Sequence, residues 1–172
     1  ATAKLAGMEL CKAYRTQYHV FFQSAVAGNI FGPNDDFSEH TSHVISSLIR
    51  KIHQAKIDDV PTVDVWGTGE PIRDFIYIDD LIDGCLFVME KYRKNEPINI
   101  GTGRQTKIVD LARLISSIIG YRGELKFDRE KPDGMPRKVL DITTIFDLGW
   151  RPQVGLEAGI QSTYEWYCSK GI

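Results

Sequence analysis

The chain has 172 residues, 42% of them hydrophobic, and a formal net charge of −2. This length and composition predict one ordinary globular core, and the small charge excludes bulk attraction to nucleic acid or to anionic lipid. Because no apolar run reaches the ~20 residues that span a bilayer and no signal sequence stands out, we expect a cytoplasmic protein that binds neither nucleic acid nor a membrane.

The chain alternates helical and strand patterns from its first residues. Periodicity from Leu5 onward predicts an opening helix, and residues 20–26 have the composition of a strand. A helix from Thr41 to about Ile57 follows, with Thr41 or Ser42 as its N-cap. The remaining predicted elements are strands at 62–66, 72–78, 97–100 and 124–127, a helix capped by Asp79, a helix at 107–119 ended by Gly120, a short helix that ends at Leu148 and a closing helix at 156–168.

Three cysteines, Cys11, Cys85 and Cys168, have neither Cys-x-x-Cys spacing nor the accompanying histidines of a metal site. Each falls in a helical pattern, where a small buried thiol is the simpler interpretation. We therefore expect no structural metal and no disulfide.

Polar loops mark the candidate site. The Gly28–Asp36 loop follows the first strand, and in an alternating α/β chain ligands bind where strands end. The stretch His40–Lys51 runs from a polar loop into an amphipathic helix, whose spacing places Lys51 beside an apolar row that faces the protein. Residues 131–138, rich in proline, glycine and charge, are interpreted as a ligand-facing loop.

Strand alternation adds Arg73, which shares a face with two aromatic residues and lies at the start of its strand, after the Trp66–Pro71 turn. A loop can fold over a ligand at that point, so a cleft is favoured over the outer face of the sheet. Two Gly-x-Gly pairs, at 67–69 and 101–103, lack the third glycine of a dinucleotide fingerprint. Neither pair therefore predicts a phosphate cradle.

These residues carry a resemblance to a known family. Ala1–Lys4 is similar to the segment that follows the tyrosine in the Tyr-x-x-x-Lys motif of extended short-chain dehydrogenases, with that tyrosine one place before Ala1. From end to end the chain resembles the carboxyl-terminal half of the GDP-L-fucose synthase family, the GDP-4-keto-6-deoxy-mannose epimerase/reductases. The matching segments, in family order, are Asn29–Pro33, Ser42–Ile45, Val65–Gly69, Arg73–Phe75, Asp79–Asp80, Asn99–Gly103, Lys131–Gly134, Pro136–Lys138 and Leu148–Trp150.

The resemblance implies a fold and a domain division. The fold is the α/β, carboxyl-terminal, substrate-binding part of an extended short-chain dehydrogenase with a Rossmann-like NAD(P)-binding fold. The resemblance makes residues 1–35 the residual end of the Rossmann domain and residues 36–172 mainly the sugar-nucleotide-binding domain. The whole chain is expected to be one α/β fragment that lacks the amino-terminal nucleotide-binding half, in agreement with its start without methionine and directly in helical periodicity.

The implied activity uses NADP: a GDP-4-keto-6-deoxy-hexose is epimerised at C3 and C5 and then reduced at C4. The 172 residues alone are expected to be inactive. The intact protein is expected to be a homodimer, with an apolar helix face near Leu5, Met8 and Leu10 that the missing half or a second subunit covers. Two alternatives stay open, a sister enzyme for another GDP-keto-sugar such as a colitose or deoxy-heptose synthase, and a non-catalytic sugar-nucleotide-binding module.

The implied catalytic residues are Lys4 and His43. The Lys4 ammonium holds the nicotinamide ribose and lowers the pKa of the family's tyrosine, and an imidazole at His43 can move protons beside a ketone near neutral pH. The simpler interpretations are a solvated lysine and a capping or core histidine. His19, His40 and His53 lack such context and are taken as surface or structural residues.

The implied cofactor contacts surround the nicotinamide. The chain departs from the family here, because Ala-Gly-Asn stands where the family usually has Pro-Thr-Asn. Small residues still permit close approach of the backbone to a ligand. The cofactor-binding residues are Lys4, Ala27, Gly28, Asn29, Ile30 and His43.

The implied contacts with the GDP-sugar combine fixed charges with one flat apolar surface. Two phosphates need cations, and an arginine can bind an oxyanion through two donors at once. The simpler interpretation of each position is a solvated charge, or a half-buried tryptophan beside a turn. The substrate-binding residues are Lys51, Trp66, Arg73, Asp133 and Lys138.

Overall fold

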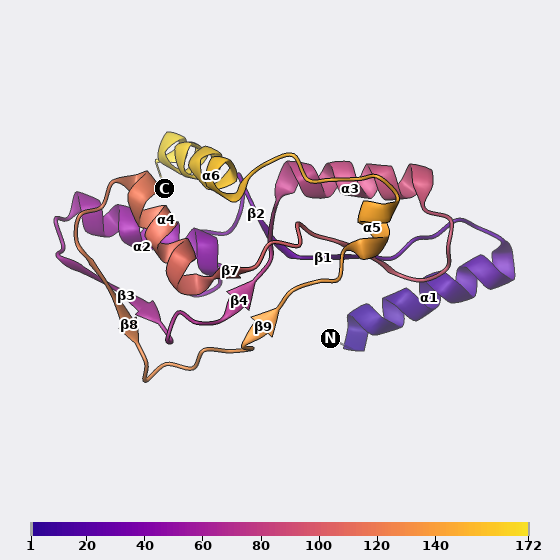
Figure 1. Ribbon diagram of the computed structural model, residues 1–172, viewed down its shortest axis with the longest axis horizontal. Coiled ribbons are helices and arrows are strands. Elements are labelled where there is room, and N and C mark those ends of the chain that lie inside the picture. The colour runs from indigo at the N-terminus through magenta and orange to yellow at the C-terminus, as the bar shows by residue number, and fades with distance from the viewer. Residues whose placement is uncertain (1, 172) are drawn as a thin grey trace.

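The computed structural model describes residues 2–171 and shows an elongated α/β arrangement (Figure 1). The helices are α1 (Thr2–Tyr18), α2 (Val44–Ile57), α3 (Ile78–Lys91), α4 (Ile108–Ile119), α5 (Thr143–Asp147) and α6 (Leu156–Lys170). The strands are β1 (Ala25–Ala27), β2 (Asn29–Phe31), β3 (Thr62–Trp66), β4 (Ile72–Arg73), β5 (Phe75–Tyr77), β6 (Ile98–Ile100), β7 (Thr106–Lys107), β8 (Glu124–Asp128) and β9 (Arg137–Lys138).

The strands form small sheets rather than one continuous sheet. Parallel pairs join β1 to β6, β2 to β5 and β3 to β8. A three-stranded sheet of order β7-β4-β9 lies between the two ends of the molecule, with β4 antiparallel to β7 and parallel to β9 (Figure 1). This middle sheet connects the two packed ends described next.

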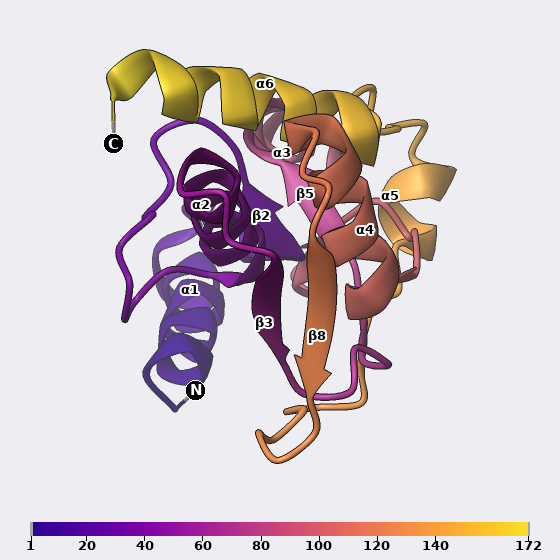
Figure 2. The same ribbon diagram turned by 90° about the vertical axis from the view of Figure 1, so that its left-hand side faces the viewer.

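The larger core lies between the β3–β8 pair and helices α2, α4 and α6 (Figure 2). Ile45, Ile49 and Ile52 repeat at helical spacing on α2 and are at most 2% exposed, and they face Leu111 and Ile115 of the α4 side of the core. Fully burying one such side chain stabilises the fold by roughly 1.5–3 kcal/mol. The predicted amphipathic α2 is therefore confirmed, and its packing fixes which of its residues remain available to a ligand.

The smaller core joins α3, β5, β6 and α5 at the other end. Ile76, Ile98 and Ile100 are at most 1% exposed. The indole of Trp150 is buried against them, and its Nε1–H donates to Asp83 of α3 at 2.7 Å. This packing attaches the segment after α5 to the face of α3.

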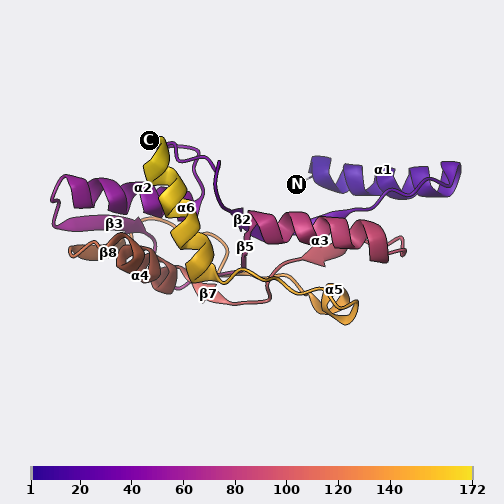
Figure 3. The ribbon, with the colours of Figure 1, turned by 90° about the horizontal axis from the view of Figure 1, so that it is seen from above.

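Helix α1 has no buried residue and lies at the opposite end of the molecule from α2, with its amino end turned toward the middle (Figures 1 and 3). Leu5 and Leu10 are 61% and 59% exposed, so the predicted apolar face is present and open in this chain. Arg15 holds α1 to the fold by donating to the carbonyls of Phe22 and Arg93 at 3.1 and 3.0 Å. What covers the apolar face remains a prediction.

No helix within residues 2–171 combines the length and the apolar character that a membrane crossing requires. The three thiols are free, with Cys11 and Cys85 partly buried. Cys168 is exposed, so the expectation of a buried thiol is wrong at that position. The reason is that Cys168 lies on the face of α6 away from Ile160 and Tyr167, which pack into the larger core.

The predicted strand at 20–26 is wrong in position, because pairing begins only at Ala25, opposite Ile98. Phe21 is 46% exposed, and the guanidinium groups of Arg15 and Arg93 lie 4.6 and 4.7 Å from the centre of its ring. Cation–π contacts, rather than a neighbouring strand, therefore hold this apolar segment.

The predicted strand at 72–78 is interrupted at Asp74, which separates β4 from β5. Its side chain turns inward to hydrogen-bond Thr102 and Gly103, and is 1% exposed. Phe75 and the residues after it in β5 are all buried, so both faces of β5 are covered. The strand whose alternation placed Arg73 is therefore interrupted at Asp74, and the position of Arg73 is taken from the pairing of β4.

Both predicted helix N-caps are wrong. Helix α2 begins after His43 and α3 begins after Tyr77, and neither residue makes a side-chain capping bond. The hydroxyl of Thr41 is instead donated to Asp36, which removes Thr41 from the helix start. Asp79 lies inside the first turn of α3, where its charge still complements the helix dipole.

Candidate functional site

A cleft of about 470 Å³ opens at the carboxyl end of β3. This is the end of a parallel strand at which α/β proteins bind ligands. Its walls come from the loop before α2, from α2 itself, from β3 and from the first residue of α4. The lining residues are Glu39, His40, Ser42, Val44, Ser47, Leu48, Arg50, Lys51, Asp64, Val65, Trp66 and Ile108.

Two of the predicted substrate-binding residues meet in this cleft. Trp66 is 66% exposed, and the Lys51 Nζ lies 5.4 Å from the centre of its ring. A second ammonium, that of Lys131, lies 5.7 Å from the same centre. Lys131 was not among the predicted site residues, although it begins the 131–138 loop that was predicted to face a ligand. Neither was His40, which lines the cleft although the sequence indicated a surface role.

Arg73 and Lys138 are also brought together, on neighbouring strands. They are register partners in the parallel pairing of β4 with β9. The guanidinium of Arg73 donates to the carbonyl of Ile72 at 2.8 Å, and no ion pair found within residues 2–171 includes either cation. Part of the predicted loop at 131–138 is thus a strand, and its pairing places two cations side by side.

Asp133 has a different position from that expected of a ligand acceptor. Its carboxylate accepts bonds from the Thr68 backbone N–H at 2.6 Å and from the Thr68 hydroxyl at 2.7 Å. Gly67 has φ +84°, and a side chain there would collide with the Asp133 carboxylate. The Gly67–Gly69 turn, which was not predicted to be a phosphate cradle, therefore does bind an anion, but that anion is a carboxylate of the same chain.

The second Gly-x-Gly turn does the same with the buried Asp74. Its carboxylate accepts bonds from the Thr102 and Gly103 N–H groups at 3.1 and 3.2 Å, and from the Thr102 hydroxyl. The backbone carbonyl of Asp74 accepts from the Asn29 backbone N–H at 2.9 Å and from its side-chain amide at 2.8 Å. One residue thereby fixes both the 101–103 turn and the segment predicted to contact the nicotinamide.

That segment runs from the end of β1 into β2. Ala27 is paired with Ile100, and the Gly28 N–H donates to the Ile100 carbonyl at 3.0 Å. Asn29 is bonded to Asp74, while Ile30 remains 42% exposed. The backbone is therefore fixed and presents one apolar side chain outward, which is a suitable surface for a flat aromatic ring.

His43 is exposed at the start of α2 and does not line the cleft, whose wall passes through its neighbours Ser42 and Val44. Its carbonyl accepts the Ser47 N–H at 2.8 Å. Nearby, a hydrogen bond from Thr41 holds the pKa of the Asp36 carboxyl below its ordinary value, with smaller contributions from Ser38 and from the charge of His43. The loop that presents the imidazole is thus held by its own polar contacts.

Lys4 is exposed in the first turn of α1, the helix that lies at the opposite end of the molecule from α2 (Figure 1). No hydrogen bond or ion pair within the described residues joins it to His43. The structure therefore shows no direct contact between these two residues, and their catalytic roles remain a prediction.

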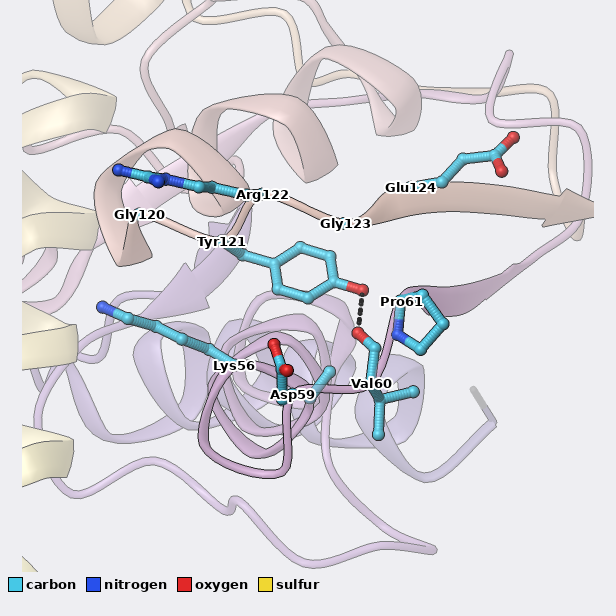
Figure 4. Close-up of a pocket in the computed structure, with 10 residues that line it drawn as sticks. Lys56, Asp59, Val60, Pro61, Gly120, Tyr121, Arg122, Gly123 and Glu124 are labelled. Atoms are coloured by element: carbon cyan, nitrogen blue, oxygen red, sulfur yellow. Dashed lines mark hydrogen bonds between the residues drawn. The ribbon is translucent and has the colours of Figure 1, made fainter.

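A second depression, of about 560 Å³, lies at the amino ends of β3 and β8 (Figure 4). Two of its polar side chains already have structural partners. The Tyr121 hydroxyl donates to the Val60 carbonyl at 2.8 Å, and the Lys56 Nζ donates to the Ile119 carbonyl at 2.6 Å, at the end of α4. No predicted site residue lies there. We therefore place the candidate site in the cleft at the other end of β3.

Comparison with known proteins identifies the family of the chain. Residues 1–101 match the family described as the NAD dependent epimerase/dehydratase family. The chain belongs to this family. A GDP-L-fucose synthase of Sinorhizobium fredii is 44% identical over 169 residues, which are 98% of this chain and 54% of that relative. The chain therefore spans about half the length of that curated member of the family.

Solved structures of the family have the same architecture. A GDP-6-OMe-4-keto-L-xylo-heptose reductase from C. jejuni superposes with a TM-score of 0.89 at 31% identity, covering 98% of this chain and 60% of the other. A GDP-L-fucose synthetase of Naegleria fowleri bound to NADP gives a TM-score of 0.90 at 26% identity, covering 95% of this chain and 53% of the other. The expected fold class, the α/β carboxyl-terminal part of an extended short-chain dehydrogenase, is confirmed.

Proposed function

We propose that this chain supplies the sugar-nucleotide-binding part of an NADP-dependent epimerase/reductase that acts on a GDP-4-keto-6-deoxy-hexose. The observation that carries the proposal is the cleft at the end of β3, in which Lys51 and the exposed Trp66 meet. An exposed indole offers a flat surface to a base or sugar, and an ammonium attracts phosphate. The GDP-sugar enzymes named above support this ligand class.

Arg73 and Lys138 add a second pair of cations to the proposed site. Their register pairing holds two positive charges together without a carboxylate partner among the described ion pairs. Two neighbouring cations make the local electrostatic potential more positive than one cation does. The arrangement therefore favours a ligand that carries more than one negative charge. We assign both residues to the diphosphate of the substrate.

The residues present also fit the nicotinamide end of NADP. Asp74 fixes the Ala27–Ile30 backbone, and Ile30 supplies the exposed apolar contact. Bound there, NADPH supplies the hydride that reduces the C4 ketone. Lys4 is proposed to hold the nicotinamide ribose, and His43 to donate and accept protons at the carbons beside the ketone.

The domain division stays part of the proposal: residues 1–35 belong to the Rossmann domain and residues 36–172 mainly to the sugar-nucleotide-binding domain. The intact protein is proposed to work in the cytoplasm as a homodimer. The open apolar face of α1 supports an additional covering surface, since Leu5 and Leu10 would otherwise remain in water.

The test is calorimetric titration of the chain with GDP and, as a control, with UDP. We expect saturable GDP binding that weakens about tenfold in Trp66→Ala, which corresponds to ~1.4 kcal/mol for the loss of an aromatic surface. Because Trp66 is exposed, this substitution should leave thermal unfolding unchanged. Absence of GDP binding, or equal binding by the variant, would contradict the proposal.

One alternative substrate has specific support. The heptose reductase likeness favours a sister enzyme that takes another GDP-keto-sugar, of the heptose or colitose kind. These two cases are separated by measuring turnover of the intact enzyme with a GDP-4-keto-6-deoxy-hexose and, side by side, with a GDP-keto-sugar of the heptose or colitose kind. A protein that binds GDP without any turnover would instead be a sugar-nucleotide-binding module.

A further inference from the structure

Two lysines from distant parts of the chain approach one exposed indole. Lys51 comes from α2 and Lys131 from the loop after β8, and their ammonium groups lie 5.4 and 5.7 Å from the centre of the Trp66 ring. Both distances are within the ~6 Å at which a cation interacts with an aromatic face. The indole, which lines the cleft together with Lys51, is therefore in contact with two positive charges.

Neither lysine is neutralised by a partner. The ion pairs found within residues 2–171 are Lys12–Glu9, Lys107–Glu70 and Arg113–Asp110. Glu39 and Asp64 line the same cleft, but neither forms an ion pair with Lys51. Two ammonium groups that share one indole and form no ion pair within residues 2–171 make the local potential positive, which favours an anion beside the ring.

The loop that carries Lys131 is attached on both sides of that residue. Before it, Asp128 accepts the Glu130 N–H at 3.0 Å through its side chain and the Lys131 N–H at 3.2 Å through its carbonyl. After it, Asp133 accepts two bonds from Thr68. Because Thr68 follows Trp66 by two residues, this attachment fixes Lys131 relative to the indole.

We propose that Lys131 and Lys51 form a two-cation clamp for a diphosphate beside Trp66, and that Asp133 positions Lys131 instead of binding the ligand. This inference rests on the proposed function and extends it to a residue that the family resemblance did not assign. A single exposed lysine–phosphate pair is weak, so specificity for a polyanion comes from two cations acting on the same group.

The experiment uses calorimetric titration of the chain with GDP, pyrophosphate and guanosine. Lys131→Met removes the charge but keeps an unbranched apolar side chain against the indole. We expect GDP and pyrophosphate to bind about five- to tenfold more weakly to this variant, equivalent to ~1–1.4 kcal/mol. Guanosine binding should change less than twofold, and Lys131→Arg should restore diphosphate binding.

A matched control is available on α6. The Lys170 Nζ lies 5.9 Å from the centre of the Trp166 ring, so Lys170→Met removes the same kind of cation–π contact on a helix that contributes no residue to the lining of the cleft. This control should bind GDP as the parent does. The positioning role is tested by Asp133→Asn, which should weaken diphosphate binding only while Lys131 is present. In a Lys131→Met background the same substitution should have no further effect.

The outcomes separate this clamp from the proposed function. If GDP binds to the parent and Lys131→Met changes nothing, the clamp is wrong and the proposed function stands. If pyrophosphate binding depends on Lys131 but guanosine adds no affinity in GDP, the clamp stands and the assignment to a guanosine nucleotide fails. If Asp133→Asn weakens binding equally with and without Lys131, the positioning role is wrong.

Discussion

Replacing Asp74 should destabilise the fold strongly, because its carboxylate is the buried anion of the 101–103 turn. It is 1% exposed and accepts the N–H groups of Thr102 and Gly103 and the Thr102 hydroxyl. Asp74→Asn places a donor against these donors and leaves at least one without a partner. Each buried polar group left unpaired costs about 1–3 kcal/mol, so we expect a loss of about 2–4 kcal/mol in the free energy of unfolding.

The assay is urea unfolding followed by far-UV circular dichroism, with the midpoint and slope fitted separately. Asp59→Asn is the matched control, because Asp59 is exposed and its left-handed backbone (φ 52°) is one that asparagine also adopts. The control should change stability by less than about 0.5 kcal/mol. An Asp74→Asn variant as stable as the control would refute the assignment of Asp74 as the anchor of this turn.

Three further predictions concern the site and its loop. Arg73→Ala should weaken GDP binding about 30- to 150-fold by calorimetry, equivalent to ~2–3 kcal/mol, with Arg73→Lys recovering part of it; a change below threefold would assign Arg73 to the surface. In the intact enzyme, His43→Gln should slow deuterium exchange beside the ketone far more than it weakens GDP binding, whereas unchanged exchange with weaker binding would make it a binding residue. The lowered pKa of Asp36 adds stability that is present above about pH 4 and lost as the pH falls through the folded-state pKa. Thr41→Val should therefore make the free energy of unfolding depend less on pH on the acid side. An unaltered pH dependence would show that Thr41 does not hold this carboxylate.

The parts of the fold predicted from the sequence are those whose pattern is complete within one segment. The alternation at 62–66 gives β3, and the periodicity at 107–119 gives α4 with Gly120 in the left-handed conformation at its end, φ 71°. The strand predicted at 97–100 is found as β6, but of the other strands of two or three residues β1 was misplaced, β4 and β5 were merged, and β2, β7 and β9 were missed. Their extent is decided by neighbours distant in the chain, such as Ile98 opposite Ala25 or Lys138 opposite Arg73.

The candidate site shows the same division. Lys51 and Trp66 were predicted and do meet, because helical spacing and strand position place each on the cleft side. The sequence marked the segments that contain Lys131 and His40 but not these two residues, and only the folded chain brings Lys131 to the Trp66 ring and His40 to the wall of the cleft. Asp133 was predicted as a ligand acceptor, but its bonds to Thr68 depend on a turn 65 residues away. The Gly67–Gly69 turn lacks a phosphate fingerprint but can still bind a carboxylate. This turn was therefore the feature of the sequence that could have indicated a structural partner for Asp133.

The most direct measurement of the central claim follows the indole N–H signals of the tryptophans by ¹⁵N–¹H NMR during titration with GDP. Trp66 is 66% exposed in the cleft, while Trp150 is 4% exposed and bonded to Asp83. The account predicts that the Trp66 signal, identified by its loss in Trp66→Phe, shifts in a saturable manner while the Trp150 signal stays in place. A titration in which GDP binds without moving the Trp66 signal would contradict a nucleotide-binding site at the end of β3.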